Sequence, residues 1–203
     1  SQLAPTYIIH NFTDNHSGSF TTLQSKSILS IARLSPEKGI DLLLQTAKKV
    51  LPLHPTWKWK LIGTGPLKKM VTDFIDQENL NNHFILQKPN GSRLDDEYLN
   101  ASLFVLSSRY ESMSMVLLEA QSYGLPLISF NCPDGPAEII THDANGLLVP
   151  AENTDALAQA ALSLIEDPAK AKQLSQQAVV YAAQFNRETV YAQWNSLFDK
   201  LLH

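Results

Sequence analysis

The sequence has very little cysteine and no long hydrophobic run, and each absence excludes a class of protein. Cys132 is the single cysteine among 203 residues, so an internal disulfide is excluded and a reducing, intracellular setting is favoured. No run approaches the roughly 18 apolar residues of a membrane-spanning helix, and the first residues lack the pattern of a secretion signal. We therefore expect a cytoplasmic protein with at most a peripheral contact at the inner face of the cell membrane.

Basic residues and metal-ligand patterns are also scarce. The chain has 16 Lys and Arg against 20 Asp and Glu, for a net charge of −4. A nucleic-acid partner is not expected, because it would need a basic face that outweighs the acids. No Asp-x-Asp occurs and the six histidines show no close ligand spacing, which argues against a metal site. Any phosphate ligand must therefore be held by a few local cations, without a metal or another cofactor.

Short apolar runs alternate with longer helical patterns from Ser25 onward. This alternation is typical of βαβ units, in which a parallel sheet carries helices on both faces. We expect an α/β, Rossmann-like parallel sheet whose six strands are Ser27–Ile31, Trp57–Ile62, His83–Leu86, Leu103–Leu106, Leu127–Phe130 and Gly146–Val149. The third and fourth strands are continuous apolar runs, which predicts that both of their faces are covered.

Helical patterns fill the connections and the end of the chain. Between the strands they are expected at Glu37–Val50, Pro66–Glu78, Asp95–Ala101, Met113–Tyr123 and Ala137–Thr141. After Pro150 the strand signal ends, and the expected helices are Thr154–Glu166, Pro168–Gln184 and Glu188–Leu201. This helical tail should pack on the outside of the sheet.

The start of the chain differs in composition from its middle. It is rich in Thr, Ser, Asn and Gly, and Thr6–Ile9 has the pattern of a short strand. We expect residues 1–25 to be a linker at an interdomain connection of a longer protein. Residues 26–186 should form one ligand-binding domain, and residues 187–203 a C-terminal helix.

Two cations follow the first predicted strand. Open parallel sheets bind ligands beyond the carboxyl ends of their strands, where helix N-termini supply free amides and a positive dipole. Arg33 and Lys38 follow Ile31 at such an end. Arg offers phosphate a planar fork and Lys a mobile point charge, so the pair suits a leaving diphosphate. On this segment alone, two solvated cations near a helix start are an equally good interpretation.

A glycine turn follows the second predicted strand, in the segment WKLIGTGP. Gly63 and Gly65 match neither the dinucleotide fingerprint GxGxxG nor the P-loop GxxxxGK[ST], so an NAD enzyme or an NTPase gains no support. Glycine allows a ligand or a backbone segment to approach closely. On this segment alone, an ordinary strand-to-helix turn is the better explanation of the glycines.

Two acids stand eight positions apart around the helix that follows the fourth strand. Glu111 and Glu119 would be separated by about 12 Å along a helix, which is comparable with the distance from a sugar to a ribose across a diphosphate. Glu119 lies among apolar residues of the helix, where a lone acid is usually partnered or functional. The alternatives are a solvent-facing Glu119 and a Glu111 that favours the first helical turn. Glu138, beyond a rigid loop, is interpreted as structural.

Together these segments resemble the C-terminal, donor-binding half of retaining glycosyltransferases of the GT-B fold. This family (group 1, family four) includes bacterial lipopolysaccharide and capsule hexosyltransferases. The matching segments, within residues 26–150, are SIARLSPEKGIDLLL, LIGTGP, RYESMSMVLLEAQSYGLPLISF and GPAEII followed by NGLLVP. The early segment PTYIIHNF resembles the end of the family's N-terminal domain, which carries the acceptor site.

The resemblance implies a role for each motif residue. Arg33 and Lys38 would hold the donor diphosphate and Glu111 the hydroxyls of the transferred sugar, which makes these three the catalytic residues. Glu119 would contact the ribose hydroxyls, and Lys88 would border the base. The remaining donor-binding positions would be Gly63, Met113, Ser114, Met115 and Val116.

The implied reaction moves a hexose from a nucleotide-sugar to a glycan or lipid-linked acceptor, and this domain alone should not carry it out. The GPAEII segment resembles that of UDP-hexose users, so UDP is expected over GDP. Ser112 replaces the glycine that usually follows the first acid, so the identity of the sugar stays open. Two alternatives remain. One is a noncatalytic module that binds a nucleotide-sugar or a partner protein, and the other is a sugar-nucleotide epimerase of the same architecture.

Overall fold

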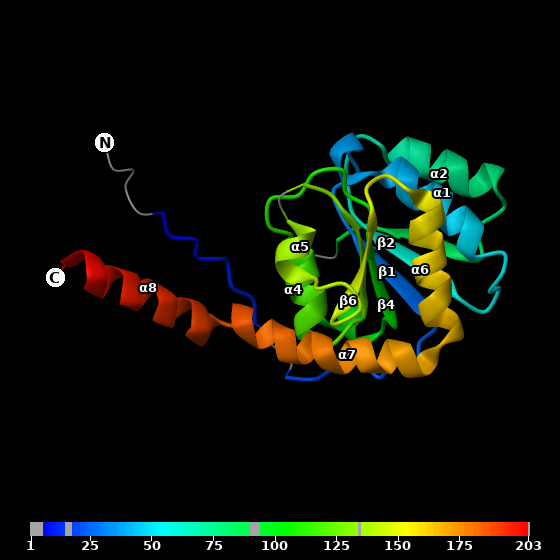
Figure 1. Ribbon diagram of the computed structural model, residues 1–203. Helices are drawn as coiled ribbons and strands as arrows, with labels where there is room; N and C mark the ends of the chain where they lie inside the picture. Colours follow the sequence, from blue (N-terminus) through cyan, green and yellow to red (C-terminus); the bar gives the residue numbers. More distant parts are fainter. Residues whose placement is uncertain (1–5, 15–17, 90–93, 134, 203) are drawn as a thin grey trace.

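The computed structural model describes residues 6–14, 18–89, 94–133 and 135–202 (Figure 1). Predictions for the start of the linker (1–5), for residues 15–17, for Asp134 of the loop before Glu138 and for His203 lie outside these residues.

Six parallel strands form a single sheet with the order β3-β2-β1-β4-β5-β6. The strands are β1 (Ser27–Ile31), β2 (Lys58–Ile62), β3 (Phe84–Gln87), β4 (Leu103–Leu106), β5 (Leu127–Asn131) and β6 (Gly146–Pro150). The predicted Rossmann-like sheet is therefore confirmed. Its six strands were recognisable because each is a short apolar run between helical patterns.

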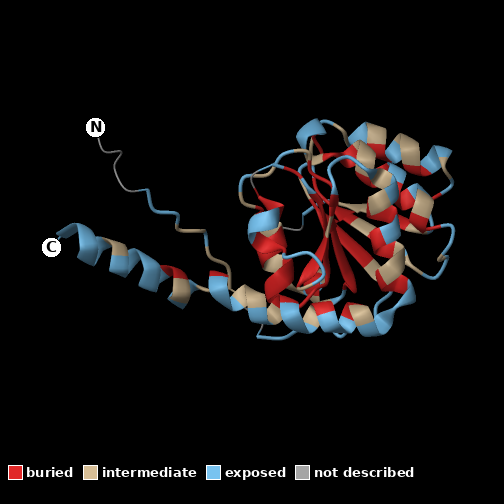
Figure 2. Cartoon of the chain, in the orientation of Figure 1, coloured by how far each residue is buried: buried red, intermediate tan, exposed pale blue. Residues whose placement is uncertain are grey.

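Helices cover both faces of the sheet, as predicted (Figure 1). One face packs against α1 (Ile40–Val50), α2 (Lys68–Gln77) and α6 (Thr154–Glu166). The other face packs against α3 (Asp95–Leu99), α4 (Met115–Ser122) and α5 (Pro136–Ile139). Successive residues of β4 belong to the two cores in turn, because side chains alternate across a strand. Figure 2 shows that burial is concentrated in the strands and on the inward sides of these helices.

The strand β3 differs from its prediction. Phe84 is buried, but Ile85, Leu86 and Gln87 are only partly buried. The strand lies at the edge of the sheet and pairs with β2 alone. The prediction that both of its faces are covered is wrong, because an apolar run does not reveal where in a sheet its strand lies.

The first predicted helix is broken near its start. A 3-10 turn, η1 (Pro36–Lys38), comes first, and α1 begins only at Ile40. Between them Gly39 has a φ of 59°, in the left-handed region. A β-carbon at Gly39 would lie 1.9 Å from the Ser107 carbonyl oxygen, so the missing side chain lets η1 press onto the end of β4. The prediction of one continuous helix from Glu37 is therefore wrong in its first turn.

The helix α4 begins at Met115, two residues after its predicted start at Met113. Ser114 has extended φ and ψ angles and serves as the N-cap. At the other end of the chain, α7 (Pro168–Ala182) passes through the 3-10 turn η2 (Ala183–Phe185) into α8 (Arg187–Leu202).

The start and the end of the chain extend together from the body of the domain (Figure 1). Thr6–Ile9 forms no strand, so that prediction is wrong. The segment lies beside α8 instead of beside another strand, and it has no ladder of hydrogen bonds to join. An ion pair of 2.7 Å between Arg187 and Asp14 joins the two segments. Among the described residues, no helix combines the length and hydrophobicity needed to span a bilayer.

The contact between Gly39 and Ser107 predicts a large loss of stability when a methyl group is added at position 39. Gly39→Ala should lower the free energy of unfolding by about 3 kcal/mol or more, because backbone strain and a clash with Ser107 combine. Gly18→Ala is the matched control, since Gly18 has a φ of 65° but nothing within 4 Å of the added carbon. It should cost only about 1 kcal/mol. Urea denaturation of both variants measures the difference, and equal losses would contradict the role of the Ser107 contact.

Candidate functional site

A cleft of about 570 Å³ opens at the carboxyl edge of the sheet, beside the ends of β1 and β2. The strand order reverses between β1 and β4, so the loops after these two strands leave in opposite directions. Open α/β sheets bind ligands at such a reversal. The cleft is lined by Ile31, Ala32, Arg33, Lys38, Ile62, Gly63, Thr64, Gly65, Pro89, Glu111, Met113, Ser114, Met115 and Val116.

Most residues that were predicted to form a site therefore share one cleft. Lys88 and Glu119 are the two predicted residues that do not line it. Lys88 is exposed after the end of β3, and its neighbour Pro89 lines the cleft in its place. Glu119 lies one helical turn beyond Met115 on α4. The ligand role assigned to each residue stays a prediction.

An ion pair lies at the centre of the cleft. Lys38 Nζ is 2.7 Å from Glu111 Oε1, and the two side chains are 27% and 8% exposed. The Ser108 hydroxyl donates a second hydrogen bond to the same carboxylate oxygen, at 2.8 Å. Because an ammonium has three N–H donors, Lys38 keeps donors for a ligand while it holds Glu111 in place.

Arg33 is the second cation of the cleft. Its side chain is exposed, and it makes no hydrogen bond or ion pair with the described residues. Nearby, the pKa of Glu37 is lowered, mainly by a hydrogen bond from the Ser35 hydroxyl, with smaller contributions from Arg33 and Lys38. The guanidinium is therefore free to bind an anion.

The first turn of α4 adds polar groups that lack partners. The Ser114 hydroxyl is buried and has no hydrogen-bond partner in the described part of the chain. The amides of Met115 and Val116 likewise make no hydrogen bond with a described residue. A buried polar group without a partner costs about 1–3 kcal/mol, so these groups suit a ligand that supplies acceptors. At a helix N-terminus, the favoured ligand is an anion.

Backbone packing explains the glycine turn beside the cleft. A β-carbon at Gly63 would lie 1.9 Å from the Ala32 carbonyl oxygen, and one at Gly65 would lie 2.4 Å from that of Leu34. The two loops are also joined by hydrogen bonds between backbone groups, including one of 2.9 Å from the Leu34 amide to the Thr64 carbonyl. The close approach of the loop after β1 is therefore sufficient to explain why position 63 is a glycine, and contact with a ligand is not needed to explain it.

A loop after β5 supports Glu111 from another side. A β-carbon at Gly135 would lie 2.9 Å from the β-carbon of Glu111. Cys132 is buried in the same loop, and burial, with a smaller contribution from the charge of Glu111, raises the pKa of its thiol. Glu138 lies further out, with its side chain 60% exposed and 3.8 Å from His10. Glu138 does not line the cleft.

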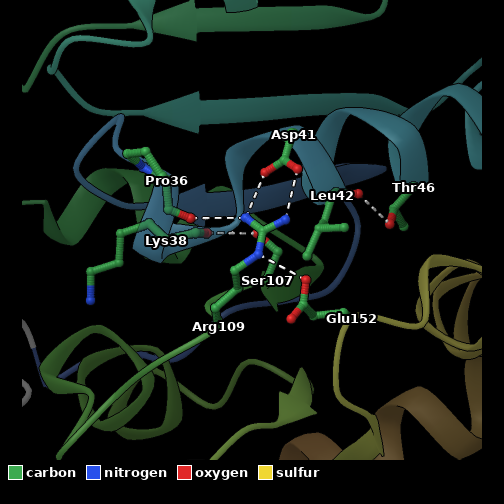
Figure 3. A network of polar contacts seen from close by, with 8 residues as sticks. All are labelled: Pro36, Lys38, Asp41, Leu42, Thr46, Ser107, Arg109 and Glu152. Carbon is green, nitrogen blue, oxygen red and sulfur yellow. Dashed lines mark hydrogen bonds and ion pairs between the residues drawn. The ribbon is translucent and has the colours of Figure 1, made fainter.

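Arg109 is a residue of the site that the sequence did not reveal (Figure 3). Its guanidinium donates two hydrogen bonds of 2.8 Å to the Asp41 carboxylate, one of 2.9 Å to the Pro36 carbonyl and one of 2.8 Å to Glu152. Its backbone amide donates to the Glu37 carbonyl at 2.9 Å. Arg109 therefore ties the loop that carries Glu111 to the turn that carries Lys38. Arg109 and Asp41 stand 68 positions apart in the chain, so no local signal reveals this contact.

Two further observations concern a metal site and a second cavity among the described residues. No three His, Cys, Asp or Glu side chains gather there in a way that could hold a metal ion. A second cavity, of about 590 Å³, lies between α7 and residues 20–24, close to the starts of β2 and β4. Its lining is mostly apolar and includes none of the predicted site residues.

The network of Arg109 predicts a measurable contribution to stability. Arg109→Met should lower the free energy of unfolding by about 1–2 kcal/mol, because Asp41 and the Pro36 carbonyl lose their donor in a partly buried place. Lys69→Met is the control, since Lys69 forms an exposed pair with Asp73 and should contribute less than about 0.5 kcal/mol. Urea denaturation compares the two, and an equal effect would contradict the assignment.

The same network predicts a dependence on pH. The hydrogen bonds from Arg109 lower the pKa of Asp41 in the folded chain. A lowered folded pKa means that the contribution of Asp41 is fully present above the ordinary carboxyl pKa of about 4, and is lost as the pH falls through the folded value. The stability difference between the unchanged chain and Asp41→Asn should therefore be largest near neutral pH and shrink below about pH 4. A difference that stays constant with pH would show that the charge of Asp41 is not involved.

Comparisons with known proteins agree with this geometry. An exopolysaccharide phosphotransferase of Streptomyces coelicolor is 33% identical over 183 residues, which are 90% of this chain and 19% of that protein. The amylovoran biosynthesis glycosyltransferase AmsD of Erwinia amylovora is 30% identical over 173 residues, which are 85% of this chain and 48% of that protein. The chain thus spans less than half the length of either relative.

Among solved structures, a mutant of Staphylococcus aureus TarM in complex with fondaparinux, alpha-GlcNAc-glycerol and UDP has a TM-score of 0.85 and 26% identity. The match covers 95% of this chain and 39% of that chain. The family model described as glycosyl transferases group 1 matches residues 12–180, and so includes every residue of the cleft. On the strength of that match, the chain belongs to the glycosyl transferases of group 1.

Proposed function

We propose that this chain is the donor-binding domain of a retaining hexosyltransferase. Its donor would be a nucleotide-sugar, with a UDP-hexose favoured, and its acceptor a glycan or a lipid-linked sugar. The observation that carries the proposal is the single cleft in which the ion pair of Lys38 and Glu111, the guanidinium of Arg33 and the free amides of α4 line one space. Cations and amides suit a diphosphate, and a carboxylate suits sugar hydroxyls.

The groups of the cleft can take part in each step of the proposed transfer. The bond between the anomeric carbon and the diphosphate oxygen breaks, and Arg33, Lys38 and the first amides of α4 neutralise the charge that grows on the diphosphate. The acceptor hydroxyl attacks from the same face of the sugar and passes its proton to the departing diphosphate oxygen, so no covalent bond to the protein is needed. Glu111, held by Lys38 and Ser108, accepts hydrogen bonds from the transferred sugar.

Two considerations support the choice of donor. The related TarM structure contains UDP, and its identity to this chain is 26%. Arg33, Lys38 and the first amides of α4 offer positive charge and donors to a diphosphate, although Lys38 also pairs with Glu111, and we propose that no metal is required. The acceptor would be bound by a part of the full-length protein outside this chain.

The proposal predicts a selective effect on turnover. In the full-length protein, Lys38→Ala should lower kcat by roughly 10²–10³-fold, the usual loss for one group that stabilises developing charge. The affinity for the donor should fall less, because Arg33 and the amides of α4 remain. Steady-state kinetics on a UDP-hexose, together with titration of UDP, measure the two quantities separately.

Lys60→Ala is the matched control for this experiment. Lys60 pairs with Glu97 at 2.6 Å, with side chains 26% and 19% exposed, and it does not line the cleft. It should leave kcat nearly unchanged. Unchanged turnover in Lys38→Ala would remove Lys38 from the mechanism, and equal losses in both variants would point to a general effect on folding.

A second candidate is the transfer of a sugar phosphate, which the name of the Streptomyces coelicolor relative favours. That reaction would break the bond between the bridging oxygen and the phosphorus that carries the sugar, and would release UMP from a UDP-sugar. Transfer of the hexose alone releases UDP. Identification of the released nucleotide in the same assay separates the two reactions.

A further inference from the structure

Two buried tyrosines stack against each other beneath α4. The rings of Tyr98 and Tyr123 are 5.1 Å apart and nearly parallel, at 12°, and both residues are 2% exposed. Each hydroxyl donates to a carboxylate: Tyr98 to Glu119 at 2.5 Å, and Tyr123 to Asp95 at 2.6 Å. The stack therefore holds two acids, but only Glu119 is on the helix whose start lines the cleft.

The hydrogen bond from Tyr98 occupies one oxygen of Glu119 and leaves the other available. Oε2 accepts from the phenol, whereas Oε1 has no partner among the described residues. Glu119 follows Val116 by three positions and Met115 by four, and both of these residues line the cleft. Positions three and four apart share one face of a helix, so Glu119 lies on the same face of α4 as these two residues, one turn beyond the cleft lining.

The Tyr98 hydroxyl stays protonated and can donate its hydrogen bond throughout the neutral pH range. Burial, together with the charge of Glu119, raises the pKa of Tyr98 well above its ordinary value. The hydroxyl therefore keeps its proton at neutral pH and continues to donate to the carboxylate. A long, partly exposed Glu side chain would otherwise have to be ordered when a ligand binds, which weakens affinity.

We propose that Tyr98 is a positioning residue for ribose recognition. It holds the Glu119 carboxylate so that the free oxygen accepts a hydrogen bond from a ribose hydroxyl of the nucleotide. This inference rests on the proposed function, since it needs a nucleotide donor in the cleft. The positioning by Tyr98 would also make the site specific for ribose. A nucleotide without the ribose hydroxyls would leave the fixed Glu119 oxygen without a hydrogen-bond partner, and would therefore bind more weakly.

The test compares ligands that differ only in those hydroxyls. UDP and GDP, each beside its 2′,3′-dideoxy form, are titrated calorimetrically into the unchanged chain and into Tyr98→Phe. The unchanged chain should prefer the ribose form. Tyr98→Phe should bind that form roughly five- to tenfold more weakly and the dideoxy form equally well, which is about the size of one hydrogen bond.

Tyr123→Phe is the matched control, because it removes the other hydroxyl of the same stack and leaves the bond between Tyr98 and Glu119 in place. It should keep the full preference for ribose. Glu119→Asp is the second variant, and it remains informative if Tyr98→Phe does not fold. It keeps the charge but withdraws the carboxylate by one methylene group, so it should lose the preference.

Each other result overturns the inference in a recognisable way. An equal loss of both ligand forms in Tyr98→Phe would show a general structural effect. A full preference for ribose in Tyr98→Phe or in Glu119→Asp would show that the carboxylate needs no positioning, and would leave the proposed function intact. An unchanged chain that binds neither UDP nor GDP would overturn the proposed function and the inference together.

Discussion

The candidate site depends on one constraint, the attachment of the loop after β4 to the turn after β1. Arg109 makes this attachment through Asp41 and the Pro36 carbonyl, and Gly39 allows the two backbones to touch. Lys38 and Glu111 meet at 2.7 Å because the two segments that carry them are held together. A short ion pair between two otherwise independent loops would lose much of its strength to side-chain and loop entropy.

The cleft brings together several polar groups that have no partner among the described residues. The Ser114 hydroxyl, the first amides of α4 and the Arg33 guanidinium make no hydrogen bond within the described residues. Most buried polar groups of a protein are paired, so a cluster of exceptions indicates a place where a ligand completes the hydrogen bonding.

The cleft and the helix beside it contain both held and unpartnered side chains. Glu111 and Glu119 are each held by a hydroxyl donor, from Ser108 and Tyr98 respectively. Arg33, in contrast, is exposed, and its side chain makes no hydrogen bond with the described residues. Fixed acceptors suit the defined geometry of hydroxyl groups, while an exposed cation without a partner suits an anion.

The sequence by itself determined the strands, the helices on both faces and most of the cleft. These features follow from local periodicity and from the rule that ligands bind beyond the carboxyl ends of parallel strands, which brought Lys38, Glu111 and the start of α4 to one edge. Only the tertiary structure decided that β3 is an edge strand, that Thr6–Ile9 is not a strand, and that Arg109 and Tyr98 donate hydrogen bonds to Asp41 and Glu119. Those outcomes depend on contacts between residues distant in the chain, and periodicity carries no information about such partners.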